Sequence, residues 1–186
     1  MVGPMSLVDV KEEFYKVLHP KLTVLIAAYS RDGRPNVMAC SWITPASEEP
    51  PLIAAFISKA SYTRQLILGS KCFTVNVPTL DMLKAVWVAG TKTGRRVDKV
   101  REMGITVKPA RSVKAPIIEG CAAYLECRLS QAVEVGECTA IVGEVVEAYA
   151  DPQLFREGQW DVERAKLLLH LGGAAFTHPS GLVRAR

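Results

Sequence analysis

The chain has 186 residues and a mass of 20.3 kDa, and 49% of its residues are hydrophobic, enough for one domain with a full-sized core over residues 1–186. Its formal net charge of +4 is small, and basic residues alternate with acidic ones, as in residues 98–102, which argues against a nucleic-acid-binding surface. Because no apolar stretch reaches the ~20 residues of a membrane span and residues 1–10 lack a secretion-signal pattern, we expect a soluble cytoplasmic protein without a membrane partner.

The first part of the chain predicts a helix and a β-hairpin. Apolar residues recur at helical spacing over residues 6–18, and His19-Pro20 marks the end of that helix. Residues 22–29 are apolar except for Thr23, which is typical of a strand buried on both faces. The Asp32-Gly33 turn then leads to a second strand over residues 36–44, so we expect the two strands to pair as a hairpin.

The middle of the chain predicts two further strands and three short helices. Residues 52–57 and 72–77 are apolar and flanked by turn residues, as strands are. Between them, residues 61–68 have helical spacing and begin with a serine suited to capping a helix. Helical spacing returns over residues 80–89 and 95–103, with a glycine-containing turn between the two helices.

The last part predicts two long strands over residues 121–135 and 139–149, and a short helix over residues 161–171 within a C-terminal segment at 160–186. Strands and helices do not alternate regularly along the chain, which disfavours a doubly wound sheet. We therefore expect a mainly β fold: a closed antiparallel barrel over about residues 20–150, with helices inserted between its strands.

Hydroxyl and amine side chains gather directly after the third expected strand. Ser58 and Lys59 follow that strand, and Ser61 and Thr63 lie at the start of a helix. Free backbone N–H groups and the helix dipole favour a dianion there, so this segment predicts a phosphate site. The alternative is that Ser58 only ends the strand and Ser61 only caps the helix.

The second expected strand has a mixed composition on both of its faces. One face carries Asn36, Met38, Cys40 and Trp42, and the other carries Val37, Ala39, Ser41 and Ile43. Such a polar and aromatic mixture is typical of a barrel wall that contacts a planar heteroaromatic ligand. An edge strand in a dimer interface would have a similar composition, so both interpretations stay open.

Metal and common nucleotide motifs are missing from the sequence. The five cysteines are scattered, with no C-x-x-C pair and no histidine at metal-ligand spacing, so we expect small buried hydrophobic residues in a reducing compartment. A redox-active thiol at Cys40 is the alternative. No Rossmann or P-loop motif occurs, and we interpret residues 90–94 first as a helix-to-helix turn and second as part of an anion site.

A series of short motifs recurs in a fixed order along the chain. They are His19-Pro20, Asp32-Gly33-Arg34-Pro35-Asn36, Ser41-Trp42, Pro50-Pro51, Ser61-Tyr62-Thr63, residues 73–77, Gly94-Arg95 with Asp98-Lys99, Ala115-Pro116, Glu126-Cys127, residues 142–145, and Leu171-Gly172-Gly173. This order, from about residue 18 to 176, resembles the flavin reductase-like, FMN-binding split-barrel family, which includes flavoredoxin. The resemblance implies a six-stranded Greek-key split barrel, a homodimer, and noncovalent FMN near the subunit interface, reduced by NADH or NADPH.

The resemblance also implies roles for particular residues. Residues 36–44 would lie against the isoalloxazine and ribityl chain, residues 58–63 would hold the phosphate, and Asn76 and Lys99 would approach from neighbouring elements. The cofactor-binding residues expected on this basis are Asn36, Cys40, Ser41, Trp42, Ile43, Thr44, Ser58, Lys59, Ala60, Ser61, Thr63, Asn76 and Lys99, with Ser41 and Trp42 closest to the ring. The alternatives are a core aromatic at Trp42, a bulge-capping amide at Asn76 and a solvated charge at Lys99.

The activity that the resemblance implies is that of an oxidoreductase passing electrons from NAD(P)H to free flavin, a ferric complex or a partner protein. Hydride moves directly from nicotinamide to flavin, so this hypothesis names no catalytic base. An electron-carrier flavoprotein without NAD(P)H turnover and a noncatalytic binder of another planar ligand are the alternatives. We expect His170 and His178 near the mouth of the site, where a nicotinamide phosphate could contact them, although a helix-ending His170 would also interact with the helix dipole.

Overall fold

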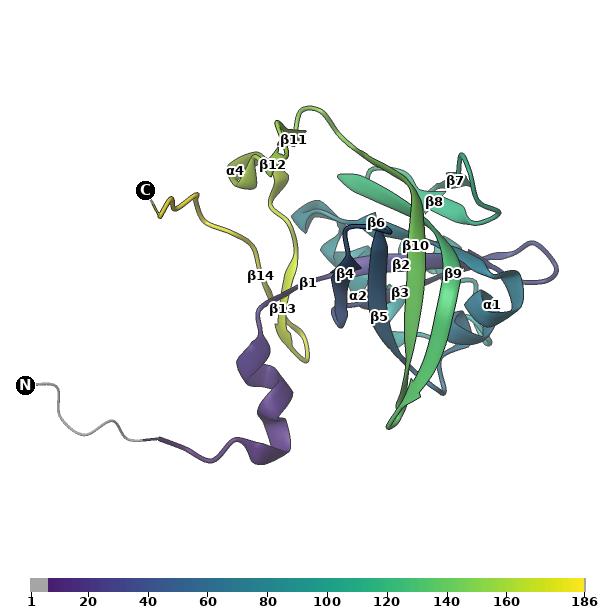
Figure 1. Ribbon diagram of the computed structural model, residues 1–186, viewed down its shortest axis with the longest axis horizontal. Helices are drawn as coiled ribbons and strands as arrows, with labels where there is room; N and C mark the ends of the chain where they lie inside the picture. Colours follow the sequence, from purple (N-terminus) through teal and green to yellow (C-terminus); the bar gives the residue numbers. More distant parts are fainter. Residues whose placement is uncertain (1–6, 186) are drawn as a thin grey trace, which may run out of the picture.

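The computed structural model describes residues 7–185, and its largest element is a seven-stranded antiparallel sheet with the order β3-β2-β6-β9-β10-β5-β4 (Figure 1). Its strands are β2 (Val24–Tyr29), β3 (Pro35–Cys40), β4 (Ile43–Ser47), β5 (Leu52–Ser58), β6 (Cys72–Val77), β9 (Ala123–Val135) and β10 (Cys138–Ala150). The first and last strands in this order, β3 and β4, are joined directly through Ser41 and Trp42. The sheet therefore closes on itself as the expected barrel.

The expected single strand over residues 36–44 is the point of closure. Its first half, β3, pairs with β2, whereas its second half, β4, pairs with β5, and the backbone N–H of Phe56 donates to the carbonyl of Trp42 at 2.8 Å. The prediction of one uninterrupted strand was wrong, because the chain changes pairing partner at Ser41-Trp42. Counting β3 and β4 as one bent strand gives the six strands expected. Along β3, no strand of residues 7–185 pairs with the edge that faces away from β2.

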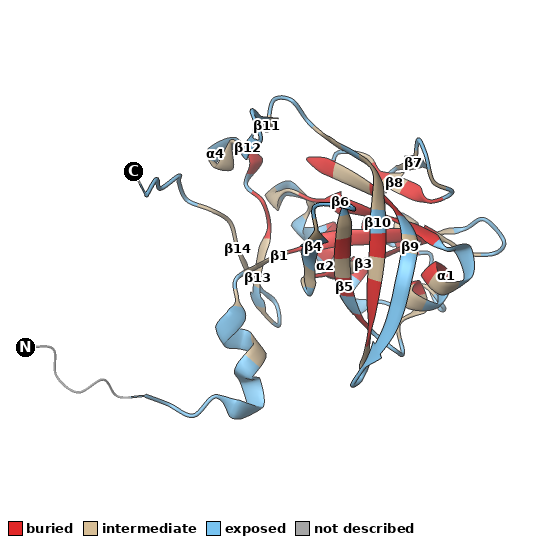
Figure 2. Ribbon diagram, viewed as in Figure 1, coloured by how far each residue is buried: buried red, intermediate tan, exposed pale blue. Residues whose placement is uncertain are grey.

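Alternation along β2 divides the apolar residues between two cores. Ile26 and Ala28 point into the barrel, where they meet Phe73 of β6 and other interior residues. Leu25 and Ala27 point outward and pack under the helices that cover this side. Figure 2 shows the resulting buried strands at the centre of the molecule. The unbroken apolar run of β2 is explained by this burial on both faces.

The helices are inserted between strands, as expected. They are α1 (Tyr62–Ser70), α2 (Leu83–Thr91), which follows the 3-10 turn η2 (Leu80–Met82), α3 (Lys99–Met103) and α4 (Val162–Ala165). Short strand pairs complete the fold: β7 (Val107–Pro109) with β8 (Pro116–Ile118), β11 (Phe155–Arg156) with β12 (Gln159–Trp160), and β1 (Lys21–Leu22) with β13 (Leu169–Gly172) and β14 (Ala175–Thr177). Helix α3 begins later than predicted because the Asp98 carboxylate caps it, accepting from the Arg101 N–H at 3.1 Å.

Two terminal predictions require correction. The helix expected over residues 6–18 is a 3-10 helix, η1 (Lys11–Leu18), with no buried residue in that range, and residue 6 lies outside the described part. The helix expected over residues 161–171 ends after one turn, where Lys166 adopts a left-handed backbone. The chain then forms β13, because pairing with β1 and β14 overrides local helical spacing. Among residues 7–185, no helix has the length and apolar character needed to cross a membrane.

Candidate functional site

The unpaired edge of β3 lies beside the start of α1. The side chain of Asn36 is buried, and its Nδ2 donates a hydrogen bond of 2.7 Å to Oγ1 of Thr63, which is also buried. Ser61 caps α1 by accepting from the Arg64 N–H, and its Oγ lies 3.6 Å from the sulfur of Met38 on β3. The fold thus brings the expected phosphate segment against the expected ring-binding strand.

The Ser58–Thr63 segment is held in place by the hairpin of β9 and β10. The Ser58 Oγ accepts from the Ala60 N–H at 3.3 Å, so this hydroxyl shapes the turn. Lys59 Nζ lies 2.8 Å from a carboxylate oxygen of Glu134, and the Arg64 guanidinium donates to the same carboxylate at 2.7 Å. Hydrogen bonds from Lys59, Arg64 and Thr139 lower the pKa of Glu134 to about 2. Glu134 therefore stays ionised and fixes both cations beside the segment.

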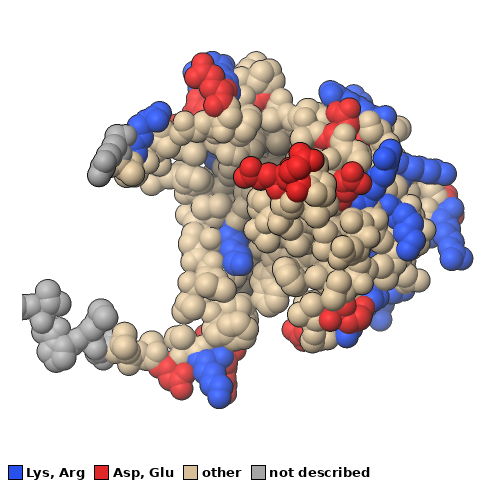
Figure 3. Space-filling view, viewed as in Figure 1, with Lys and Arg blue, Asp and Glu red and all other residues tan. Residues whose placement is uncertain are grey.

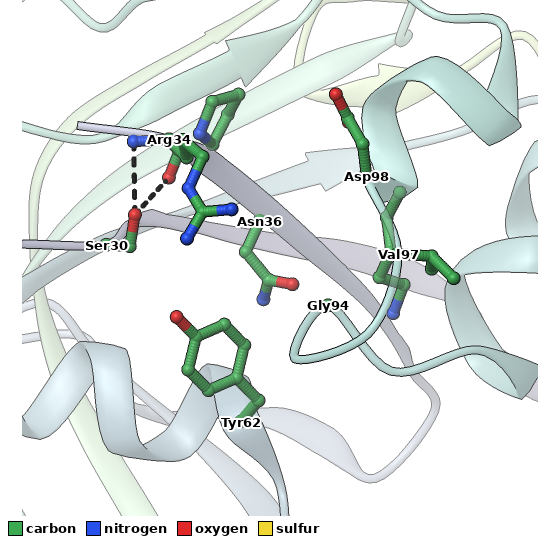
Figure 4. Close-up of a pocket in the computed structure, with 9 residues that line it drawn as sticks. Ser30, Arg34, Asn36, Tyr62, Gly94, Val97 and Asp98 are labelled. Carbon is green, nitrogen blue, oxygen red and sulfur yellow. Dashed lines mark hydrogen bonds between the residues drawn. The ribbon is translucent and has the colours of Figure 1, made fainter. Parts of the chain in front are cut away.

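Gly94 closes the site from the other side, in the loop between α2 and α3 (Figure 4). A Cβ at position 94 would lie 2.0 Å from Oδ1 of Asn36, so only glycine fits there. That oxygen is buried and has no hydrogen-bond partner within residues 7–185. Buried polar atoms are almost always paired, and an orphaned acceptor beside a cavity is therefore a place where a ligand donor belongs.

Asn36 and Gly94 line a small cavity of about 100 Å³, together with Ser30, Arg34, Pro35, Tyr62, Val97, Asp98 and Lys99. Lys99 is 4% exposed, and its Nζ donates to the carbonyl of Ala89 at 2.5 Å. Burial lowers the pKa of Lys99 to about 8, which leaves it mostly protonated at neutral pH. The structure thus places Lys99 at the cavity rather than in solvent.

A second cavity, of about 410 Å³, lies at the other end of β3. Its lining residues are Thr23, Ala39, Ser41, Trp42, Val86, Trp87, Gly90, Thr91, His170, Gly173, Ala174 and Phe176. Trp42 is 38% exposed, so it is not the core aromatic of the alternative interpretation. Ser41 contributes a hydroxyl, 3.2 Å from that of Thr23. An apolar slot with a few hydroxyls suits a planar ligand.

Asn36 and Ser41 are five residues apart on an extended strand, a separation of about 16 Å at the usual rise per residue. The first cavity offers polar and cationic groups, and the second offers aromatic walls. A ligand with an anionic end and a planar end, joined by a polar chain, fits this arrangement.

Comparison with known proteins agrees with this geometry. A family model described as the flavin reductase like domain matches residues 17–175. The chain belongs to the flavin reductase-like family. This membership indicates a flavin-binding protein of the oxidoreductase type. An uncharacterized protein of Archaeoglobus fulgidus is 37% identical over 161 residues, which cover 86% of this chain and 89% of the relative.

Two solved structures share the fold of this family member over nearly its whole length. Flavoredoxin from Methanosarcina acetivorans has a TM-score of 0.85 at 26% identity and covers 97% of this chain and 95% of its own. An FMN-binding domain of a flavin reductase-like enzyme from Shewanella baltica has a TM-score of 0.80 at 26% identity and covers 97% of both chains. The split-barrel expectation is confirmed.

Asn76 does not reach either cavity of this flavin reductase-like chain. Its side chain is fully buried, and Nδ2 donates to the Leu25 carbonyl and to Thr74 Oγ1, each at 3.0 Å. Its Oδ1 accepts from the Ile118 N–H at 2.8 Å. Because its donor and acceptor atoms are both used inside the protein, Asn76 acts as a structural amide that ties three strands together.

The side chain of Cys40, the last residue of β3, does not line the second cavity. Its side chain belongs to the barrel interior, and burial raises the pKa of the thiol to about 11. A thiol that stays protonated is a poor nucleophile, so this environment does not favour the redox alternative. Ile43 and Thr44 line a different groove beside Trp42, together with Phe14 and other apolar residues of η1. Neither residue lines the second cavity.

His170 and His178 lie in different environments, and only His170 lines one of the two cavities. His170 lines the second cavity, but it lies on β13 rather than at a helix end, so the dipole explanation was wrong. His19 Nδ1 donates to the carbonyl of His170 at 2.8 Å. The imidazole of His178 donates to the carbonyl of Pro179 at 2.9 Å, and His178 lines neither cavity.

The sequence analysis missed several residues of the two cavities. Trp87 and Phe176 line the second cavity, yet neither carried a chemical signal beyond its apolar character. Tyr62 and Gly90 also line the cavities, and they lie inside the segments 58–63 and 90–94 that the sequence did single out. Gly94 also carried a signal, because it begins the motif Gly94-Arg95. Its role is steric, and steric roles appear only when the opposing residue is known.

Proposed function

We propose that this chain binds FMN noncovalently along β3 and uses it to pass electrons from NADH or NADPH to a small acceptor. The observation that carries the proposal is the buried, unpaired Oδ1 of Asn36, enclosed by Thr63 and Gly94. A ribityl hydroxyl is a donor of the right kind for that oxygen. The similar Shewanella baltica domain is an FMN-binding domain, which supports the same choice of cofactor.

The phosphate end of FMN would lie at the segment of Ser58, Lys59, Ala60, Ser61 and Thr63. The N-terminal N–H groups of α1 and the Thr63 hydroxyl, which uses only its acceptor site for Asn36, would donate to it. Lys99 adds a positive charge on the far side of the cavity. Lys59 would stabilise the position of this segment through its ion pair with Glu134.

The ring end would lie in the cavity of Ser41 and Trp42, with the backbone from Cys40 to Thr44 along one edge. When bound, FMN supplies the site that accepts a hydride and releases electrons. The chain's own contribution is position and exclusion of water, which Trp42, Trp87 and Phe176 provide by walling the cavity.

We also propose that two copies associate through the exposed apolar face near η1. Phe14, Val17 and Leu18 are each more than 60% exposed, and a groove of about 200 Å³ beside them is lined by Trp42 and Phe56. Contiguous exposed apolar surface of this kind marks association sites. Light scattering at micromolar protein is expected to give the mass of a dimer. We further propose that the protein is a soluble cytoplasmic enzyme.

The test of the function is the visible spectrum of the purified protein, followed by titration with FMN and rapid mixing with NADH or NADPH. The expected result is saturable binding and fast bleaching of the flavin band with at least one nucleotide. If FMN binds but neither nucleotide bleaches it rapidly, the protein is an electron carrier rather than a reductase. A colourless protein that fails to take up FMN would leave only a noncatalytic ligand-binding role.

A further inference from the structure

A groove of about 670 Å³ lies beyond the anionic end of the FMN site, between the β2–β3 turn and α1. Its volume is within the ~300–1,000 Å³ typical of small-molecule sites. It shares Ser30, Arg34 and Tyr62 with the cavity at Asn36, so the two spaces meet at these residues. In Figure 4 the Arg34 guanidinium and the Tyr62 hydroxyl point toward the space between Ser30 and Asn36.

The groove is positively charged. Arg31, Arg34 and Lys114 line it, and Asp32 is its only acidic lining residue in the described chain. Asp32 pairs with Arg34, whereas neither Arg31 nor Lys114 has an ion-pair partner within residues 7–185. Figure 3 shows Lys and Arg side chains gathered at the end of the molecule where Figure 1 places the β2–β3 turn. Two unpaired cations beside a groove favour an anionic ligand.

The groove also has aromatic and hydroxyl groups. Tyr29 and Tyr62 line it from β2 and α1, and Ser70, whose hydroxyl donates to the Cys72 carbonyl at 2.9 Å, lines it as well. The Arg95 guanidinium lies 4.8 Å from the centre of the Tyr62 ring, which holds that ring in place by a cation–π contact. Aromatic faces next to cations are the combination that binds a base and its phosphate.

We propose that this groove binds a nucleoside phosphate attached to the flavin phosphate, so that the chain binds FAD more tightly than FMN. The inference rests on the proposed flavin site, because it requires the flavin phosphate to lie beside Asn36. From there the second phosphate of FAD reaches the junction at Arg34. The adenosine then extends toward Lys114 and the tyrosines.

The experiment compares FAD and FMN by fluorescence titration of the flavin-free protein, which measures binding without turnover. FAD is expected to bind at least tenfold more tightly than FMN. In the double variant Arg31→Ala/Lys114→Ala this preference should fall to within twofold, with the FMN affinity unchanged. Lys84→Ala, an exposed change on α2 that lines neither space, is the matched control and should keep the full preference.

AMP gives a second measurement on the unmodified chain. Millimolar AMP is expected to weaken FAD binding and to leave FMN binding unchanged, because it competes only for the groove. Equal affinity for FAD and FMN, or a double variant that retains the preference for FAD, would overturn the inference while leaving the FMN site intact. If neither flavin binds, the proposed function itself fails.

Discussion

The two ends of β3 differ in how far the chain itself completes them. At the Asn36 end, the side chain is 4% exposed, bonded to Thr63 and covered by Gly94. At the Ser41 end, Trp42 is 38% exposed beside an open cavity and contacts only the Tyr15 ring of η1 at 5.9 Å among aromatic partners in the described chain. The first end is preorganised for the ribityl chain at Asn36 and the phosphate at Thr63, and the second leaves room for a ring and a second substrate. Substitutions that disturb Asn36 or Thr63 should therefore affect flavin affinity more than a substitution at the open end.

Gly94→Ala should have the largest effect. The added Cβ would lie 2.0 Å from Oδ1 of Asn36, and because the opposing side chain is buried, it cannot move aside. Overpacking of this kind costs about 1–3 kcal/mol of folding stability. Displacing the Asn36 amide to relieve the overlap should move that cost to the bound state, where it corresponds to a loss of FMN affinity of up to about 100-fold. Fluorescence titration with FMN measures it.

The control for that change is Gly69→Ala on α1. A Cβ at position 69 would meet no heavy atom within 4 Å in the described part of the chain, so FMN affinity should not change. Equal losses in the two variants would show that the closeness of Gly94 to Asn36 is irrelevant to binding.

Thr63→Val should reduce FMN affinity at least about tenfold, since a hydrogen bond to a charged group is worth about 1.5–3 kcal/mol and about 1.4 kcal/mol is a factor of ten. Valine keeps the shape of the side chain but removes the hydroxyl that accepts from Asn36. The free energy of unfolding should also fall, because Asn36 Nδ2 loses its partner. Titration and thermal unfolding measure the two effects.

Thr106→Val, at an exposed position that lines neither cavity, is the matched control and should leave both quantities unchanged. An unchanged FMN affinity in Thr63→Val would contradict the role of this hydroxyl.

Trp42→Ala should lower FMN affinity about fivefold, since an aromatic contact contributes about 0.5–1.5 kcal/mol beyond its buried area. The open end holds the ring less tightly than the enclosed end holds the phosphate, so the loss should be smaller than in Thr63→Val. Leu171→Ala, also an exposed apolar residue but outside the cavity lining, should bind FMN normally. A larger loss for Trp42→Ala than for Gly94→Ala would reverse the proposed order of the two ends.

The smallest effect should be a pH dependence at the enclosed end. Burial lowers the pKa of Lys99 to about 8, so the ammonium is present below that pH and is lost above it. FMN affinity should therefore fall two- to threefold as pH rises from 7 to 9, because a partly screened ion pair contributes about 0.2–1 kcal/mol. Lys99→Met should bind FMN more weakly at pH 7 and show no such fall. If FMN affinity fell equally with pH in the unmodified chain and in Lys99→Met, Lys99 would not contribute to FMN binding.

Local patterns predicted many elements of the fold correctly. The strand expected over residues 72–77 coincides with β6, and Gly33 has the positive φ that its Asp-Gly turn requires. Ser61 caps α1 as its position implies. Each of these features depends on residues within a few positions of one another, which is why sequence alone suffices for them.

Long-range pairing limited what could be predicted about the site. The chain has two asparagines, Asn36 and Asn76, and both lie in segments that the sequence predicts as strands. Asn76 finds its partners inside the barrel, whereas the carbonyl oxygen of Asn36 is left unpaired beside a cavity. The local sequence around each amide does not show whether its carbonyl oxygen is paired, because that depends on which strand or loop faces it.

The sequence by itself determined a mainly β barrel with inserted helices, a hydroxyl-rich segment at the start of a helix, and a resemblance to flavin reductase-like proteins. Only the tertiary structure decided where the strand after the first hairpin changes partner, that β13 replaces a helix, and that Gly94 closes over Asn36. The reason is physical: turns, caps and alternation are set by neighbours along the chain. Strand partners and close approaches between distant loops are set by how the whole apolar surface is buried.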